Sequence, residues 1–230
     1  MSWTLTRVGD SALVVAFEQR IDPTINARVV RVARAVQELD HGGVQDVVDS
    51  FCAVTVYFKP LHTDVESLAR SLEEIAAGET VVREDGVEST PQRMVPVCYG
   101  GPHGPDLREV ARFGGCSEAD VVEHHVSRPY RVYMLGFLPG FAYMGSVHPR
   151  IAIPRRSTPR LRVPAGAVGI AGSQTGIYPV TAPGGWHLIG QTPLHTFTLD
   201  RADPFLLRSG DIVRFKPIGE EAFRRFVTEE

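Results

Sequence analysis

Lysine is scarce in this chain: only Lys59 and Lys216 among the 24 basic residues are lysines, and the rest are arginines. Neither lysine follows a glycine, which excludes a P-loop for nucleotide phosphates. The formal net charge is -3 and there is no basic tail, which argues against nucleic acid as the main partner. The arginine bias is also typical of a GC-rich genome.

Cysteine is equally sparse, and the three cysteines lie far apart at positions 52, 98 and 116. This spacing excludes a disulfide framework and a zinc motif. Cys52 and Cys98 lie in apolar, strand-like runs and are interpreted as small core residues. The motifs H-E-x-x-H and G-x-S-x-G are absent too. We therefore expect neither a self-contained zinc or serine hydrolase nor a metal site.

Long apolar runs are absent, so the sequence predicts no membrane span. The first residues, MSWTLTRVGDSALVVAF, have no charged start followed by an apolar core and a cleavage site. We expect a cytoplasmic protein.

The first ninety residues alternate between strand and helix patterns. Pro23 suits the first turn of a helix, and Asp64 suits the cap of a second helix that Gly78 ends. Four strands packed against two helices predict a small α+β domain. The polar segment Glu79–Pro91 reads as a linker. The expected strands are Thr4–Val8, Ala12–Phe17, Val44–Asp49 and Ala53–Phe58.

The rest of the chain is predicted to be mainly β. Two short helices are expected first: Asp106–Phe113, capped by Asp106, and Glu118–Val126, which Ser117 and Asp120 begin with a capping box. Many short strands between Gly and Pro turns predict a closed barrel or a sandwich. The expected strands are Arg93–Cys98, Arg131–Leu135, Arg162–Val163, Val168–Ala171, Ile177–Val180, His187–Gly190, Thr196–Thr198 and Ile212–Phe215, with a last helical turn at Glu220–Val227.

The segment 130–197 is dense in glycine, proline, aromatic residues, arginine and histidine. Loops of this kind on a β scaffold commonly form binding sites. Five arginines stand in a chain that Pro149, Pro154, Pro159 and Pro164 keep extended. Guanidinium groups suit a carboxylate or a phosphate, and the alternative is a solvated basic face. The arginines are Arg150, Arg155, Arg156, Arg160 and Arg162.

Trp186 and His187 follow Pro183-Gly184-Gly185, where glycines allow a close backbone approach. Trp186 suits an apolar wall and His187 suits acid–base chemistry. The alternative is a barrel-core tryptophan and a hydrogen-bonded core histidine.

The loop at residues 172–176 offers backbone N–H groups and the Gln174 amide for a small anion or amide, although a plain β-turn fits it as well. His124 and His125 are adjacent on a predicted helix, so at most one of them reaches a site. The aromatic run Tyr130, Tyr133, Phe137, Phe141 and Tyr143 is typical of a core, with a sharp bend at Gly136, Pro139 and Gly140.

Several long motifs follow one another in this chain: RVYMLGFLPGFAYMG, PRRSTPRLRVPAGAVGIAG, QTGIYPVTAPGGWHLIGQTP and GDIVRF, with VGDSALVVAF and VPVCYGG before them. In these motifs the chain resembles the family of the 5-oxoprolinase B subunit. This family is also called allophanate hydrolase subunit 1 and includes the Kip-type inhibitor of a sporulation histidine kinase. Two positions depart from the family pattern: Pro102-His103 stands where the family usually has an acidic residue before Gly-Pro-Asp, and His124-His125-Val126 stands where it usually has a His-Thr pair.

The resemblance implies a ferredoxin-like α+β domain at residues 1–92 and a mainly β, cyclophilin-like barrel at residues 93–230. Shared fold with cyclophilins does not imply prolyl isomerase activity. The family resemblance also implies that the chain is one subunit of an enzyme. It would act with a C subunit, which is an allophanate hydrolase subunit 2-like chain, and with an A subunit. Together these would cleave 5-oxo-L-proline to L-glutamate with ATP, whose site the sequence does not locate. The alternatives are a Kip-type protein inhibitor of a histidine kinase and one component of an allophanate- or urea-metabolising hydrolase.

For this lactam substrate the expected catalytic residues are His187 and, second, His124. Arg155 or Arg156 would hold the carboxylate or a phosphate, Gln174 would bind the amide, and Trp186 with Tyr178 would complete the pocket.

Overall fold

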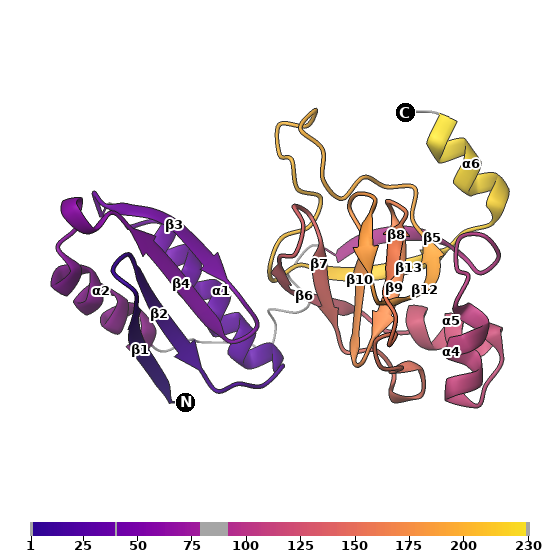
Figure 1. The fold of residues 1–230 in the computed structure, drawn as a ribbon, viewed down its shortest axis with the longest axis horizontal. Coiled ribbons are helices and arrows are strands. Elements are labelled where there is room, and N and C mark those ends of the chain that lie inside the picture. Colours follow the sequence, from indigo (N-terminus) through magenta and orange to yellow (C-terminus); the bar gives the residue numbers. More distant parts are fainter. Residues whose placement is uncertain (1, 40, 79–91, 229–230) are drawn as a thin grey trace. The chain divides into compact units, whose positions relative to one another are not determined.

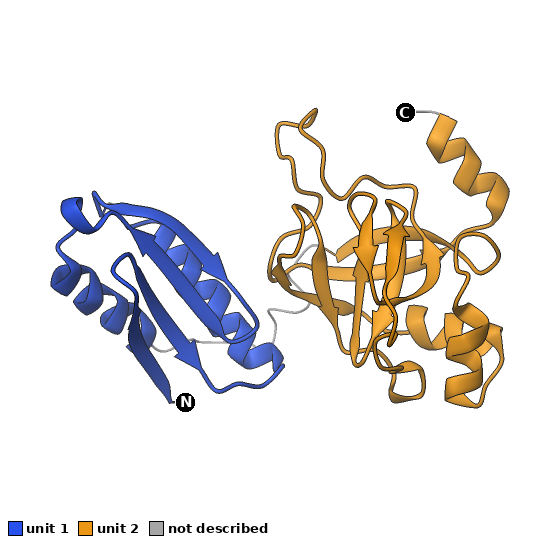
Figure 2. Ribbon diagram, viewed as in Figure 1, with its two compact units in different colours: residues 1–87 blue, residues 88–230 orange. Residues whose placement is uncertain are grey.

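The structure is a computed structural model that describes residues 2–39, 41–78 and 92–228 (Figure 1). It divides into two compact units, Met1–Val87 and Glu88–Glu230 (Figure 2). The expected linker, Glu79–Pro91, lies outside the described residues. The expected domain limits, 1–92 and 93–230, fall at or beside that segment and stay a prediction.

The first unit is a four-stranded antiparallel sheet with two helices packed on it. Asp22 caps the first helix by accepting hydrogen bonds from the backbone N–H groups of Thr24 (2.8 Å) and Ile25 (3.2 Å). Asp64 caps the second helix through the Ser67 N–H (3.1 Å). The expected strands and helices are confirmed. They are β1 Trp3–Val8, β2 Ala12–Phe17, α1 Pro23–Gln37, β3 Val44–Asp49, β4 Ala53–Phe58 and α2 Val65–Ala77, with the sheet order β1-β2-β4-β3.

The chain order of this unit is β-β-α-β-β-α. The ferredoxin-like order is β-α-β-β-α-β, so the observed order is a cyclic permutation of it. The α+β character is therefore observed, while the ferredoxin-like assignment stays a prediction.

The second unit is a closed seven-stranded barrel, which decides between the two expected β architectures. A two-stranded ribbon of β8 and β11 is separate from the barrel sheet, and α4 and α5 lie together at one end of the barrel (Figure 1). The barrel order is β10-β7-β6-β13-β5-β12-β9. The strands are β5 Gln92–Tyr99, β6 Tyr130–Leu135, β7 Ala142–Gly145, β8 Arg160–Val163, β9 Ala167–Ala171, β10 Gln174–Ile177, β11 Ala182–Gly184, β12 His187–Gln191 and β13 Ile212–Pro217; the helices are α4 Leu107–Gly114, α5 Glu118–Val126 and α6 Glu220–Thr228.

Two expected strands differ from the structure. The strand expected at Ile177–Val180 ends at Ile177 and begins earlier, at Gln174. Pro179 has no N–H group to continue a ladder, which accounts for the early end. The segment Thr196–Thr198 is not a strand: among the described residues it forms a single isolated bridge, between Phe197 and Phe205.

Apolar side chains fill the barrel and the space between it and helices α4 and α5. A second layer lies against β9 and β12 and includes Phe141, Tyr178 and Trp186. The capping box at the start of α5 is confirmed: the Ser117 hydroxyl accepts from the Asp120 N–H (3.1 Å), and Asp120 accepts from the Ser117 N–H (2.9 Å). Within the described residues, no helix combines the length and the apolar content that crossing a membrane requires.

Candidate functional site

The segment that carries the expected arginines runs alongside the start of β12. The Arg156 N–H donates to the Gly185 carbonyl (2.8 Å), and His187 Nε2 donates to the Pro154 carbonyl (3.0 Å). These two bonds bring the arginine cluster and the Trp186-His187 pair together. The sequence predicted both groups, and the structure places them side by side.

Asp106 is the polar centre of this region and is only 4% exposed. Its carboxylate accepts two hydrogen bonds from Arg160 (2.6 and 2.8 Å) and one from the Leu188 N–H (2.7 Å). Arg156 Nη1 lies 3.4 Å from the same carboxylate. Asp106 therefore ties the start of α4 to strand β12 and to the ribbon strand β8.

The expected capping role of the Asp106 side chain is wrong. Asp106 occupies the N-cap position of α4, but its side chain makes no capping hydrogen bond. The Asp106 carboxylate instead accepts hydrogen bonds from Arg160, Arg156 and the Leu188 N–H, so its oxygens face these groups and not the first turn of α4.

His187 has one ring nitrogen with a partner and one without. Because Nε2 donates to the Pro154 carbonyl, Nδ1 carries the lone pair in the neutral ring. Nδ1 is buried and has no hydrogen-bond partner among the described residues. The nearest carboxylate oxygen is Glu109 Oε2 at 3.6 Å, and that oxygen also lies 3.3 Å from Arg156. This arrangement suits His187 as a general base, because the Glu109 carboxylate would stabilise the positive charge of the ring once Nδ1 has accepted a proton.

Asp106 and Glu109 were not among the expected site residues. They lie three residues apart at the start of α4, and residues at that spacing share one face of a helix. A carboxylate pair on one helix face, beside a proline- and arginine-rich segment, is the signal that sequence reasoning missed.

Asp106, Glu109 and His187 present donor atoms within 4.8 Å of one another. The Asp106 oxygens already accept from Arg160 and from a backbone N–H. A metal ion here would have to displace a guanidinium group. The mixture of two arginines, two carboxylates and a histidine instead suits a small polar substrate that carries its own charge.

Trp186 and Tyr178 are almost fully buried, at 4% and 1% exposed. They pack edge to face against Phe141, with ring centroids 5.4 and 5.1 Å away. The Trp186 backbone hydrogen-bonds the Tyr178 hydroxyl. The two rings therefore form a wall behind the polar residues and leave little surface for a ligand.

Arg155 is exposed and lies close to two tyrosine hydroxyls. Burial raises the pKa of Tyr143 and of Tyr178, and the Arg155 charge partly offsets both shifts. Arg155 thus presents a positive charge beside the aromatic wall, next in the chain to Arg156. Its place fits the expected carboxylate-binding role, which stays a prediction.

Gln174 lies at the tip of the β9–β10 hairpin, opposite Ala171 and Gly145. Gly172, at φ +57°, makes the turn, so the glycine-rich loop is in part the β-turn that the sequence allowed. The Gln174 side chain is half-buried. Its role in binding an amide is untested.

The two adjacent histidines of α5 face in different directions, as expected. His125 is fully buried in the barrel, where Nε2 lies 2.9 Å from the Thr175 hydroxyl and Nδ1 lies 2.8 Å from the Tyr99 hydroxyl. Burial lowers the pKa of His125 to about 3. His124 stacks on His148 at 4.1 Å between centroids, so its described contact is not with His187.

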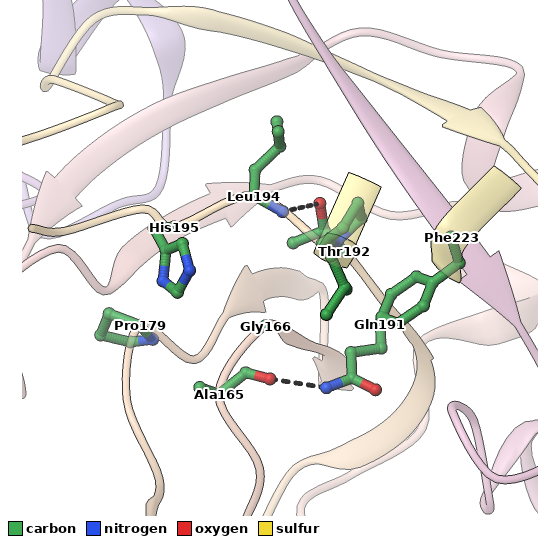
Figure 3. A pocket seen from close by; sticks show the side chains of 10 residues that line it. Ala165, Gly166, Pro179, Gln191, Thr192, Leu194, His195 and Phe223 are labelled. Carbon is green, nitrogen blue, oxygen red and sulfur yellow. Dashed lines mark hydrogen bonds between the residues drawn. The ribbon is translucent and has the colours of Figure 1, made fainter. Parts of the chain in front are cut away.

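A separate pocket of ≈ 510 Å³ lies beside the end of β12 (Figure 3). It contains none of the expected site residues. Gln191 and Phe223 form part of its wall, and Gln191 Nε2 donates to the Ala165 carbonyl (2.7 Å). The remaining lining residues are Gly166, Pro179, Thr192, Pro193, Leu194, His195 and Val227.

A comparison with known protein families identifies the class of domain to which this barrel belongs. Residues 3–207 match the family described as "Carboxyltransferase domain, subdomain C and D", and the chain belongs to this family. Its relatives among curated proteins are named as the B subunit of 5-oxoprolinase. The Bacillus subtilis (strain 168) protein is 39% identical over 99% of this chain and 98% of its own length. The Escherichia coli O157:H7 protein is 43% identical over 91% and 94%. The resemblance found in the sequence is confirmed.

Solved structures agree with this assignment. TTHA0988 is 35% identical with a TM-score of 0.81, and the match covers 90% of this chain but 40% of that one. A conserved uncharacterized protein from Pyrococcus horikoshii is 41% identical with a TM-score of 0.58, over 96% of this chain and all of that one. The K. lactis urea amidolyase, 18% identical with a TM-score of 0.75 over 99% of this chain and 15% of its own, shows the shared fold alone.

Proposed function

We propose that this chain is the B subunit of an ATP-dependent 5-oxoprolinase. With the C and A subunits it would cleave 5-oxo-L-proline to L-glutamate, and it would be inactive without them. The observation that carries the proposal is the near full-length match, at 39% and 43% identity, to curated proteins named as the 5-oxoprolinase B subunit. TTHA0988 is more than twice as long as the matched region, which is consistent with a site completed by further chain.

The residues offer a division of roles for this reaction. His187 Nδ1, with a free lone pair, accepts a proton from the attacking water, and Glu109 stabilises the imidazolium that results. The water oxygen enters the new carboxylate, and the proton passes to the released amine as the lactam C–N bond breaks. The complex would hydrolyse ATP with a second water to ADP and phosphate, and this reaction would supply the free energy for opening the lactam. The ATP site is either between subunits or on a partner subunit, and we assign no described residue to it.

Substrate recognition is assigned to the cationic side of the site. The exposed Arg155 holds the substrate carboxylate, while Arg156, which already lies near Asp106 and Glu109, positions the acid–base pair. Gln174 binds the lactam amide. Trp186 and Tyr178 back the pocket. His124 has no role in this scheme, since its described contact is with His148.

The proposal extends to the fold of each unit and to the cellular location of the reaction. We assign the first unit as a permuted ferredoxin-like domain, supported by its cyclic element order. We assign the second as a cyclophilin-like barrel, supported by its seven-stranded closure with two helices at one end. The reaction would take place in the cytoplasm, with soluble partner subunits.

The test is glutamate formation from 5-oxo-L-proline and ATP by the reconstituted A, B and C subunits. We expect activity that requires all three. His187→Ala should lower kcat by about 10²- to 10⁴-fold, the usual contribution of a general acid–base group. The control is His62→Ala, since His62 is exposed in the first unit and should leave the rate unchanged.

A complex without any glutamate formation would refute the proposed function. A fully active His187→Ala complex would instead remove His187 from the mechanism and leave the family-based assignment intact. Arg155→Ala should raise KM for 5-oxo-L-proline more than it lowers kcat, because a carboxylate clamp binds the substrate and the transition state alike.

A further inference from the structure

A second group of metal-ligating side chains lies outside the site described above. Cys98 at the end of β5, His103 in the loop after it and Glu220 at the start of α6 present donor atoms within 4.8 Å of one another. His103 Nε2 lies 2.7 Å from Glu220 Oε2, and Cys98 Sγ lies 3.9 Å from the same oxygen. A sulfur, a nitrogen and an oxygen from three segments thus converge.

A hydrogen bond on the far side of the ring fixes the orientation of His103. Its Nδ1 lies 2.8 Å from Gln191 Oε1, and the Gln191 amide nitrogen donates to the Ala165 carbonyl. Because the amide nitrogen is engaged there, the oxygen faces His103, and Nδ1 must carry the proton. An outer residue that accepts from one ring nitrogen and aims the other is typical of metal-binding histidines.

The second ring nitrogen also faces an acceptor. With the Nδ1 proton used on Gln191, Nε2 has a lone pair that points at the Glu220 carboxylate. A lone pair and a carboxylate at 2.7 Å are held together either by a proton, as a direct hydrogen bond, or by a metal ion that binds both atoms and moves them further apart.

Cys98 distinguishes these two possibilities. Cys98 is only 6% exposed, and its Sγ lies 3.9 Å from Glu220 Oε2. A proton on His103 leaves this thiol with only a weak contact. A divalent ion instead binds the thiolate directly, together with the His103 nitrogen and the Glu220 oxygen.

We propose that Cys98, His103 and Glu220 bind a divalent metal ion of the Zn²⁺ class. The thiolate and the carboxylate neutralise the two positive charges, and the neutral imidazole adds the third ligand. Sulfur, imidazole and carboxylate donors are the set that zinc takes in proteins. The Glu220 side chain is 46% exposed, so a fourth position opens to solvent.

The metal would fix a helix that has little else to hold it. Helix α6 has no buried residue, and its Phe223 ring packs at a tilt against His103, with 4.3 Å between the ring centroids. Phe223 and Val227 line the ≈ 510 Å³ pocket, where Phe223 is seen in Figure 3. A metal ion at Glu220 would therefore set the shape of that pocket. This site is independent of the proposed function.

The test is Co²⁺ titration of the metal-free full-length chain, followed by displacement with Zn²⁺. We expect one Co²⁺ per chain, with a thiolate-to-metal charge-transfer band that Zn²⁺ abolishes. Cys98→Ser should remove the band, and Cys116→Ser, the matched control, should keep it. Gln191→Leu should weaken binding about 10- to 100-fold, as loss of an outer-shell partner does.

His103→Phe keeps an aromatic ring against Phe223 and removes the ligand nitrogen, so it tests the site without depending on a change at the buried thiol. Hydrogen exchange of residues 220–228 should slow when Zn²⁺ is added to the natural chain and should not respond in His103→Phe. A chain without the charge-transfer band, or with a band that persists in Cys98→Ser, would overturn the proposal. So would α6 protection that is equal with and without metal, which would leave a His103–Glu220 ion pair only.

Discussion

At the scale of single residues, Asp106 shows how one buried carboxylate organises the site. Its carboxylate contacts three segments through Arg160 of β8, the Leu188 N–H of β12 and Arg156, and each contact involves a positive or polar donor. A buried charge of this kind is tolerable only because its partners are complete. The site's geometry therefore depends on a residue that need not touch the substrate.

Asp106→Asn keeps the shape and removes the charge. We expect it to lower the free energy of unfolding of the second unit by about 2–3 kcal/mol, since two guanidinium groups lose their counter-charge. Urea unfolding measures the change. Asp203→Asn is the control, because the Arg208–Asp203 pair is exposed at 65% and 50% and should contribute little. Equal losses in both variants would show that Asp106 has no special role.

His125 makes stability depend on pH. Its pKa falls from 6.5 to about 3 on folding, because burial disfavours the charged ring. The unfolded chain therefore binds the proton more readily, and stability is lost as pH falls below 6.5. The free energy of unfolding should decrease by up to about 1.4 kcal/mol per pH unit from this group alone. The window from pH 6.5 to 4.5 lies above the ordinary pKa of the carboxyl groups with lowered values, such as Glu220.

His125→Gln tests this contribution, since glutamine keeps a polar side chain that does not titrate. The variant should show a flatter dependence of unfolding free energy on pH between 6.5 and 4.5. His124→Gln should keep the natural slope. If both variants and the natural chain share one slope, another group controls the acid sensitivity.

At the scale of secondary-structure elements, the sequence predicts the features that depend on local signals and misses those that depend on contacts between distant residues. The helices of the first unit follow from Asp22, Pro23 and Asp64, which act within one turn. The pairing of His187 with Glu109 joins residues far apart in the chain, and no local pattern marks it. The capping role predicted for the Asp106 side chain is wrong because the local sequence indicates a helix cap, while its hydrogen-bond partners come from the distant strands β8 and β12.

Strand prediction failed where strands are short. Strand β7, Ala142–Gly145, is a four-residue segment that ends in glycine and was not expected. The segment Thr196–Thr198 has β-branched residues but makes only one bridge. In both cases the neighbouring strands decide the outcome, because strand propensity depends on context.

Gly190 allows strand β12 to pair with β5 and complete the barrel. A side chain there would lie 2.6 Å from Val97 and 2.8 Å from the Cys98 carbonyl. Gly190→Ala should therefore cost about 1–3 kcal/mol of the second unit's unfolding free energy, as overpacking does. Gly219→Ala is the matched control, since nothing lies within 4 Å of a side chain there. Equal urea midpoints for the two variants would contradict the steric argument.

At the scale of the whole molecule, each unit has its own core. The cluster around Leu13, Ile25 and Leu68 lies in the first unit, and the two others lie in the second. We expect two unfolding transitions. The chain has two tryptophans, Trp3 in the first unit and Trp186 in the second, so Trp186→Phe and Trp3→Phe leave one fluorescent reporter for each.

Gly190→Ala combined with these reporters gives a direct test. The transition reported by Trp186 should move to lower urea concentration, and the one reported by Trp3 should stay in place. A shift of both transitions together would show that the units unfold as one.

The pairing of β5 with β13 determines when the second unit is complete during synthesis. These strands are parallel neighbours, with Ile212 opposite Gln92 and Pro217 opposite Val97. The first strand of the barrel leaves the ribosome more than a hundred residues before its partner, and its edge stays open to other chains meanwhile. The first unit is a compact unit within residues 1–87, so its chain is complete before the second unit is synthesised. A stalled or truncated translation product would thus carry a folded first unit attached to an open, aggregation-prone sheet.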